Sequence, residues 1–200
     1  MSMNEELKST LVKMVEEENH LKAELASDGS LYEGYPVKIR ELHLNQANVL
    51  ERIVETYGWP KISLVGKKGA DAAWLILQHS ISRPDFMKRC FPVFESAVQE
   101  NEARSRHLAC LTDGIRYFSR EPQVYGSYFD WNEKGQLCPW VIEDPENVNE
   151  RRKKMGLNTL EERIKEMEGD VRKNNLLPPK DYLERQSEMN QFLKEVGWIA

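Results

Sequence analysis

Positions of apolar character recur at helical spacing over two long segments near the start of the chain. In residues 4–26 they fall three or four residues apart, which is the period of an amphipathic α-helix. A second segment repeats this period until Gly58 and Pro60 end it. Two such helices must bury their apolar faces against other elements, so the pattern predicts a mainly helical core. The positions that mark the two faces are Leu7, Leu11, Met14, Val15, Leu21 and Leu25, and Ile39, Leu42, Gln46, Val49, Leu50, Ile53 and Tyr57.

Helical patterns continue through most of the remaining chain. Gly66 and Gly69 bracket a predicted loop, and Pro92 predicts a kink inside a later helix. Thr159 and Glu162 have the spacing of a capping box, which marks another helix start. The further helices are predicted over residues 70–80, 84–99 and about 102–118, and after the turns at 144–145, 158–159 and 178–179.

One stretch has the period of a β-strand instead. Aromatic and polar residues alternate in YGSYFDW and QLCPWVI, on either side of a turn, NEKG, that contains a glycine. Pro139 has no backbone N–H, so the second strand is expected at an edge or a bulge. We therefore expect an α+β fold that is predominantly α-helical, with helices packed around a core and one small antiparallel β-hairpin near residues 123–142.

The amino-acid composition disfavours nucleic acid and membranes as partners. The 200 residues carry a formal net charge of −5, and the cations are scattered among acids, which disfavours nucleic acid as a partner. No apolar run approaches the length of about 20 residues that a membrane span needs, so no membrane association is expected. The N-terminus lacks the apolar region of a signal peptide, and we expect a cytoplasmic protein.

Cysteines and clustered cations have simple structural interpretations. Cys90, Cys110 and Cys138 are odd in number and far apart, which argues against a disulfide framework and against a paired-cysteine zinc site. We expect Cys90 and Cys110 to be inert core thiols. The basic run 151–154, RRKK, lies at the predicted end of a helix, where the helix dipole favours cations.

Several motifs occur in a distinctive order. They are GWPKISLVGKKGADAAWLILQH, PDF followed by Cys90, LTDGIR, PQVYGSYFDW and IEDPENVNERRKKMGL. This succession resembles the bacterial family called domain of unknown function 6624, over about residues 4–160. The resemblance implies one domain at 1–160 and a C-terminal helical extension at 161–200. Because the family has no established activity, the resemblance implies a fold rather than a reaction.

The resemblance also implies a set of polar positions that characterise the family. Tyr128 departs from the pattern, because members often carry glutamine there, which puts a shared ligand specificity in doubt. The corresponding positions here are Glu41, His43, Gln78, His79, Asp113, Arg116, Gln123, Tyr125 and Asp144.

Two histidines stand beside apolar residues on separate predicted helices. His79 ends the run AAWLILQH, and His43 lies at the edge of the second apolar face. If the two helices pack face to face, both imidazoles are candidate catalytic residues, as a general acid and a general base, or alternatively metal ligands, for which the case is weaker. Gln78 is a candidate ligand-binding residue, because a buried amide needs a hydrogen-bond partner. The alternative for each side chain is a satisfied core residue.

A second group of candidate ligand-binding residues lies further along the chain. Arg116 could neutralise an anion together with Asp113, although a salt bridge between these two residues within one helix is the simpler expectation. Gln123, Tyr125 and Tyr128 lie on the predicted hairpin and could stack on and hydrogen-bond a planar ligand, although aromatic residues at alternating strand positions usually just pack. The lead hypothesis is a small soluble ligand-binding protein or enzyme, with one polar pocket between the His79 helix, the Asp113 helix and the hairpin.

The alternative hypothesis is a non-catalytic protein-interaction module whose polar core residues are structural. It is favoured by the absence of a nucleophile motif such as GxSxG. No metal site and no cofactor is predicted, since the sequence has no HExxH, no paired cysteines and no acidic ligand at a diagnostic interval from a histidine.

Overall fold

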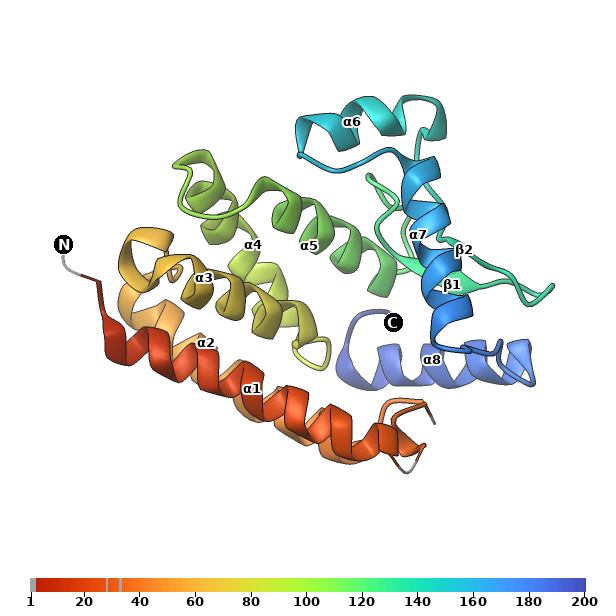
Figure 1. The fold of residues 1–200 in the computed structure, drawn as a ribbon, viewed down its shortest axis with the longest axis horizontal. Helices are drawn as coiled ribbons and strands as arrows, with labels where there is room; N and C mark the ends of the chain where they lie inside the picture. Colours follow the sequence, from red (N-terminus) through yellow and green to blue (C-terminus); the bar gives the residue numbers. More distant parts are fainter. Residues whose placement is uncertain (1–2, 28, 33) are drawn as a thin grey trace. The chain divides into compact units, whose positions relative to one another are not determined.

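Helices dominate the structure, as the apolar spacing predicts. The computed structural model describes residues 3–27, 29–32 and 34–200. Within them, eight α-helices and one two-stranded antiparallel sheet confirm the predominantly helical α+β fold (Figure 1). The chain divides between Arg104 and Ser105 into two units. No helix of the described residues has both the length and the apolar character that crossing a membrane requires.

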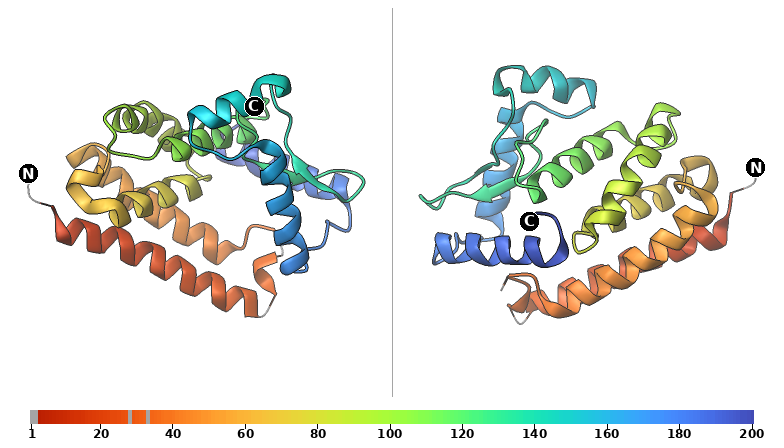
Figure 2. Two further views of the ribbon diagram at one scale, coloured as in Figure 1. Left: turned by 45° about the horizontal axis from the view of Figure 1, so that its top comes forward. Right: turned by 180° about the vertical axis from the view of Figure 1, so that it is seen from behind.

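The first unit is built from helices alone. The three long helices α1, α2 and α3 lie side by side (Figures 1 and 2). Gly58 ends α2 as predicted, with a positive φ of 70° that glycine adopts without strain. The elements of this unit are α1 (Glu5–Ser27), the 3-10 turn η1 (Ser30–Tyr32), α2 (Val37–Tyr57), α3 (Ile62–His79) and α4 (Pro84–Gln99).

The structure corrects the predicted start of α3. The helix begins at Ile62, and the residues between Gly66 and Gly69, predicted as a loop, belong to it. Gly66 has a φ of 68°, so the helix bends there and then continues. A glycine therefore marks a kink within the helix instead of a loop before it.

Packing of α1 against α3 positions the polar centre described below. The two helices run in the same direction, and the Asn4 N–H donates to the Leu64 carbonyl at 2.8 Å near their starts. Ala70 and Ala73 are buried on α3 and leave room for close packing. Glu18 and His79 consequently meet further along the two helices.

The second unit combines helices with the predicted hairpin. The strands pair Asp130 with Cys138 in an antiparallel register, and Pro139 lies at the end of the second strand. Thr159 and Glu162 form the predicted capping box. The elements of this unit are α5 (Ser105–Phe118), β1 (Phe129–Trp131), β2 (Leu137–Pro139), the 3-10 turn η2 (Pro145–Asn147), α6 (Val148–Lys154), α7 (Leu160–Lys173) and α8 (Tyr182–Val196).

Polar side chains fasten the parts of the second unit together. Asp130 is buried and accepts from the Tyr117 hydroxyl, from Arg185 and from Gln186, which ties α8 to α5 and the hairpin. Arg152, from the RRKK run, is also buried and donates to the carbonyls of Tyr125 and Asn158. The run does lie in the last turn of α6, as predicted, and Arg152 has this buried structural role in addition.

Candidate functional site

The predicted site residues fall into two groups, one in each unit. Gln78 and His79 are partly buried on α3, and His43 is buried on α2. The remaining candidates, Asp113, Arg116, Gln123 and Tyr125, all belong to the second unit. The predicted pocket that would join the two groups stays a prediction.

Asp113 has a structural task in the second unit. Its carboxylate is fully buried and accepts from the backbone N–H groups of Val124, Tyr125 and Ser127 at 2.8–3.0 Å. Burial raises the pKa of this carboxyl, an effect that the three N–H donors oppose only in part. Asp113 thus organises the loop before the hairpin.

Gln123 and Arg116 make similar internal contacts. The buried Gln123 amide donates to the carbonyls of Tyr128 and Trp140 and accepts from the Tyr128 N–H. Arg116 bonds to Glu143 and to the Pro122 carbonyl, so the predicted pairing of Arg116 with Asp113 was wrong. Asp113 instead meets the loop after α5, whose N–H groups need an acceptor.

The first unit brings His43 and His79 together around a third residue, Glu18. The Glu18 Oε1 atom lies 2.9 Å from His79 Nδ1 and 3.4 Å from His43 Nε2, and the Lys22 ammonium contacts the same oxygen. The two imidazole rings are stacked, with centroids 4.9 Å apart and planes 22° apart. Three helices therefore supply one cluster, which we call the Glu18–His43–His79 triad.

Burial sets this triad apart from a surface ion pair. Glu18 is 1% exposed, and the His79 side chain, at 25%, is the most accessible of the three. Despite the short separations, neither Glu18 oxygen, nor His43 Nε2, nor His79 Nδ1 has a hydrogen bond of acceptable geometry within the described residues. Buried polar atoms are nearly always satisfied, and here the Lys22 ammonium is the charged group in contact with Glu18 Oε1.

Electrostatics within the triad favour its ionised carboxylate and neutral imidazole. Burial alone would raise the pKa of the Glu18 carboxyl, but His43, His79 and Lys22 together hold it well below its usual range. Burial lowers the pKa of the His79 imidazole, and the nearby Glu18 charge opposes this only in part. These are the protonation states that bind a metal ion.

Tyr35 and Gln46 support the triad from α2 and the segment before it. The Tyr35 hydroxyl lies 2.8 Å from His43 Nδ1, which orients the ring so that Nε2 points towards Glu18. Burial raises the pKa of Tyr35 to about 12, so its hydroxyl stays protonated at neutral pH. One turn along α2, the Gln46 amide donates to the Met14 carbonyl of α1 at 2.7 Å.

Glu18 was not among the predicted site residues, although the sequence contains a signal for it. One face of α1 is marked by residues that are spaced alternately four and three positions apart, at 7, 11, 14, 18, 21 and 25. Among these six residues only Glu18 is charged. On α2, the buried positions Ile39, His43, Gln46 and Leu50 follow the same alternation. His43 therefore lies within the buried face of α2, which corrects the prediction that it lies at the edge. A charge in a core position of a helix is the signal that identifies the triad.

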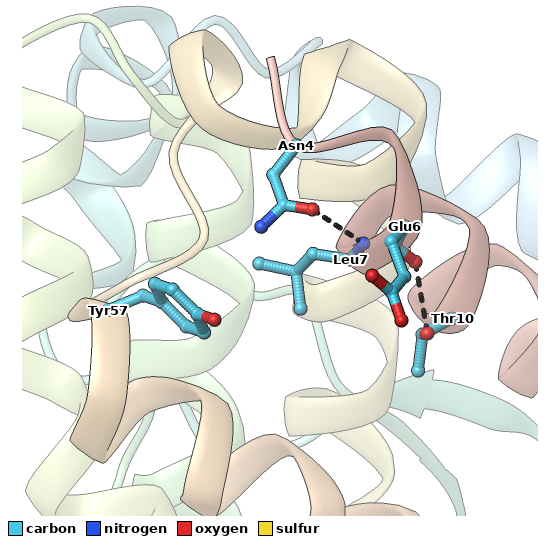
Figure 3. A pocket seen from close by; sticks show the side chains of 5 residues that line it. All are labelled: Asn4, Glu6, Leu7, Thr10 and Tyr57. Carbon is cyan, nitrogen blue, oxygen red and sulfur yellow. Dashed lines mark hydrogen bonds between the residues drawn. The ribbon is translucent and has the colours of Figure 1, made fainter. Parts of the chain in front are cut away.

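A surface pocket of about 210 Å³ lies elsewhere in the first unit (Figure 3). Its polar side chains complete the first turns of α1, because Asn4 Oδ1 accepts from the Leu7 N–H and the Thr10 hydroxyl donates to the Glu6 carbonyl (Figure 3). These bonds leave Asn4 and Thr10 with local structural roles. We therefore place the candidate site at the triad.

The surroundings of Cys90 and Cys110 do not favour a reactive thiolate. Cys90 is buried, and burial raises the pKa of its thiol to about 12. Burial also raises the pKa of Cys110. A neutral thiol is a poor nucleophile and a poor metal ligand, which agrees with the expectation that both are inert.

Comparison with known proteins identifies the family of this chain. The sequence model of a family of unknown function, DUF6624, matches residues 5–173. This range includes the triad and Asp113, and it continues to the end of α7. Comparisons with curated proteins and with solved structures gave no match. The match covers most of the chain and confirms the resemblance that the sequence motifs indicate. The chain therefore belongs to the family of unknown function DUF6624.

Proposed function

We propose that the protein binds a divalent transition-metal ion of the Zn²⁺ class through the triad, and that this ion is its functional centre. One observation carries the proposal: three side chains from three helices, two of them buried and His79 partly buried, bring their ligand atoms within 4.8 Å of one another. These atoms make no hydrogen bond of acceptable geometry within the described part of the chain, although the Lys22 ammonium contacts Glu18 Oε1.

Ligand type and spacing both support a metal. Two imidazole nitrogens and one carboxylate oxygen form a donor set that occurs in catalytic zinc sites and in non-haem iron sites. With metal–ligand bonds of about 2.0–2.1 Å, tetrahedral ligands lie about 3.3 Å from one another. The Glu18 oxygen is 2.9 Å from the His79 nitrogen and 3.4 Å from the His43 nitrogen, so two of the three pairs are near this value, and all three ligand atoms lie within 4.8 Å of one another.

Tyr35 completes the arrangement that a metal-binding histidine requires. Such a histidine usually donates its second ring N–H to an oxygen, which fixes the tautomer. When the His43 Nδ1–H donates to the Tyr35 hydroxyl, the lone pair on Nε2 faces Glu18. In the metal-free protein the opposite tautomer, in which the Tyr35 hydroxyl donates to Nδ1, lets Nε2–H face the carboxylate instead.

Three protein ligands leave a coordination position for water or substrate. Structural zinc sites use four protein ligands, whereas catalytic sites use three and lower the pKa of a bound water to about 7. His79, with 25% of its side chain exposed, provides the side of the triad nearest to solvent. This arrangement supports hydrolytic or other Lewis-acid chemistry.

Metal binding is expected to reorient the imidazole rings. A metal lies near the plane of each ring that binds it, but the rings of His43 and His79 are stacked with planes only 22° apart. We therefore expect the rings to turn away from parallel when the ion binds. His79 has freedom to do so, because it is the last residue of α3 and is followed by the non-helical Ser80.

A titration with Zn²⁺ tests the proposal. We expect one ion per chain by isothermal titration calorimetry, and a thermal midpoint that rises by about 5–10 °C at 100 times the dissociation constant. His43→Gln and His79→Gln should each weaken binding by at least about 10- to 100-fold, since this is the cost of losing even a residue that only orients a ligand. His20→Gln is the matched control, because His20 is exposed on the same helix as Glu18.

Equal Zn²⁺ affinity in His79→Gln and His20→Gln would contradict the proposal. The triad would then be a polar core that fixes helix packing, as the alternative hypothesis of a non-catalytic interaction module expects. In that case His79→Gln should lower the thermal midpoint of the metal-free protein without altering metal binding.

A further inference from the structure

We infer that Lys22 is a built-in counter-ion that occupies the Glu18 carboxylate in the metal-free protein and must leave when the metal binds. The inference rests on the proposed function and deepens it, because it identifies what controls the affinity of the triad. Its starting point is the position of the ammonium group. Lys22 lies one helical turn after Glu18 on α1 and contacts Oε1, the same oxygen that faces both imidazoles.

A carboxylate with 1% exposure needs a positive partner. Its ionised form would otherwise be disfavoured by the loss of hydration. The imidazoles of His43 and His79 supply a positive charge only when they are protonated, whereas the Lys22 ammonium contacts the same oxygen directly. Lys22 supplies the missing charge, and it does so from the edge of the cluster, since 35% of its side chain is exposed.

The metal and the ammonium compete for one atom. A metal bound to Glu18 Oε1, His43 Nε2 and His79 Nδ1 would lie next to the present position of the ammonium, where two positive charges repel strongly. Lys22 has a flexible four-carbon stem, and Glu18 is its ion-pair partner among the described residues. Rotation of this stem into solvent removes the competing charge without moving any helix.

This competition predicts opposite effects on stability and on affinity. Lys22→Met keeps the apolar stem and removes the charge, so the metal-free protein should lose about 2–4 °C in thermal midpoint. The same variant should bind Zn²⁺ about tenfold more tightly, if the lysine blocks the carboxylate in about nine of ten molecules. A lysine that only supports the fold would not raise metal affinity when it is removed.

The experiment measures Zn²⁺ affinity by competition with a chromophoric chelator in the full chain. Lys22→Met should bind more tightly than the wild type, and Lys22→Arg, which keeps the charge, should not. Lys13→Met is the matched control, because Lys13 is exposed on the same helix. Lys22→Gln repeats the test with a polar side chain, in case methionine disturbs folding.

A second measurement follows the ammonium directly. Acetylation with an amine-reactive ester, mapped by mass spectrometry, should modify Lys22 faster in Zn²⁺ than in chelator, while the rate at Lys13 stays constant. If the wild type binds one Zn²⁺ ion through His79 but Lys22→Met and Lys13→Met have the same affinity, the inference is overturned and the proposed metal site stands. If neither the wild type nor Lys22→Met binds Zn²⁺, the proposed function itself fails, and the inference with it.

Discussion

Asp113→Ala is expected to lower the free energy of unfolding by about 3–5 kcal/mol. The carboxylate is fully buried and holds three backbone N–H groups, those of Val124, Tyr125 and Ser127. Alanine leaves all three donors without their acceptor, and each buried unpaired donor costs about 1–3 kcal/mol before water relieves part of the loss. Urea unfolding at neutral pH, followed by circular dichroism, measures the change.

Two variants separate this structural role from a role in ligand binding. Asp113→Asn keeps one acceptor oxygen but turns an amide N–H towards a backbone donor, so we expect a smaller loss of about 1–3 kcal/mol. Arg116→Ala removes a partly exposed ion pair with Glu143 and should cost less than about 1 kcal/mol. If the Asp113→Ala and Arg116→Ala proteins are equally stable, the structural role of Asp113 is contradicted. Asp113 would then again be a candidate ligand-binding residue.

Glu18→Gln should reveal how strongly the triad depends on its negative charge. In chelator at neutral pH, we expect this variant to be about 3 kcal/mol less stable than the wild type. The pKa of the Glu18 carboxyl is held well below its usual range in the folded protein, so its stabilisation is fully present above the unfolded-state value near 4.5. The stabilisation is lost as the pH falls through the lower, folded-state pKa.

The pH dependence of unfolding supplies the measurement. Below about pH 4.5 the stability of the wild type should fall towards that of Glu18→Gln, because the unfolded chain takes up the proton first. Glu17→Gln is the matched control, since Glu17 is exposed on the neighbouring position of α1 and should follow the wild type. A constant difference between wild type and Glu18→Gln from pH 7 to pH 3 would show that the Glu18 contribution is not electrostatic.

Much of the fold could be predicted from the sequence, because periodicity and chain-breaking residues act locally. Apolar spacing located α1 and α2, Pro92 lies inside α4 as predicted, and the hairpin and the capping box at Thr159 are confirmed. The start of α3 could not be placed correctly, because Gly66 alone takes the positive φ while Gly69 stays helical. Both glycines can adopt a positive φ, and the neighbouring sequence does not indicate which of the two does so.

The candidate site was only partly predictable. The two histidines could be selected from their apolar neighbours, but their meeting with Glu18 depends on how three helices pack. Motif searches for metal sites rely on ligands at fixed intervals along one element, and here the ligands are 25 and 36 residues apart in sequence, at positions 18, 43 and 79. The buried contacts of Arg152 could not be predicted for a related reason, since the carbonyls to which it donates become its neighbours only in the folded unit.

The charge at position 18 interrupts a stripe of apolar residues, and this has an evolutionary consequence. Replacing Glu18 with leucine would make the stripe of α1 continuous, and such a change would spread readily if the carboxylate had no task. The three positions should also change together, because a buried imidazole that has lost its carboxylate is left without a partner. We therefore expect members of the family to carry either the complete triad or apolar residues at all three positions, with few intermediates, so that an alignment would sort them into metal-binding and metal-free lineages.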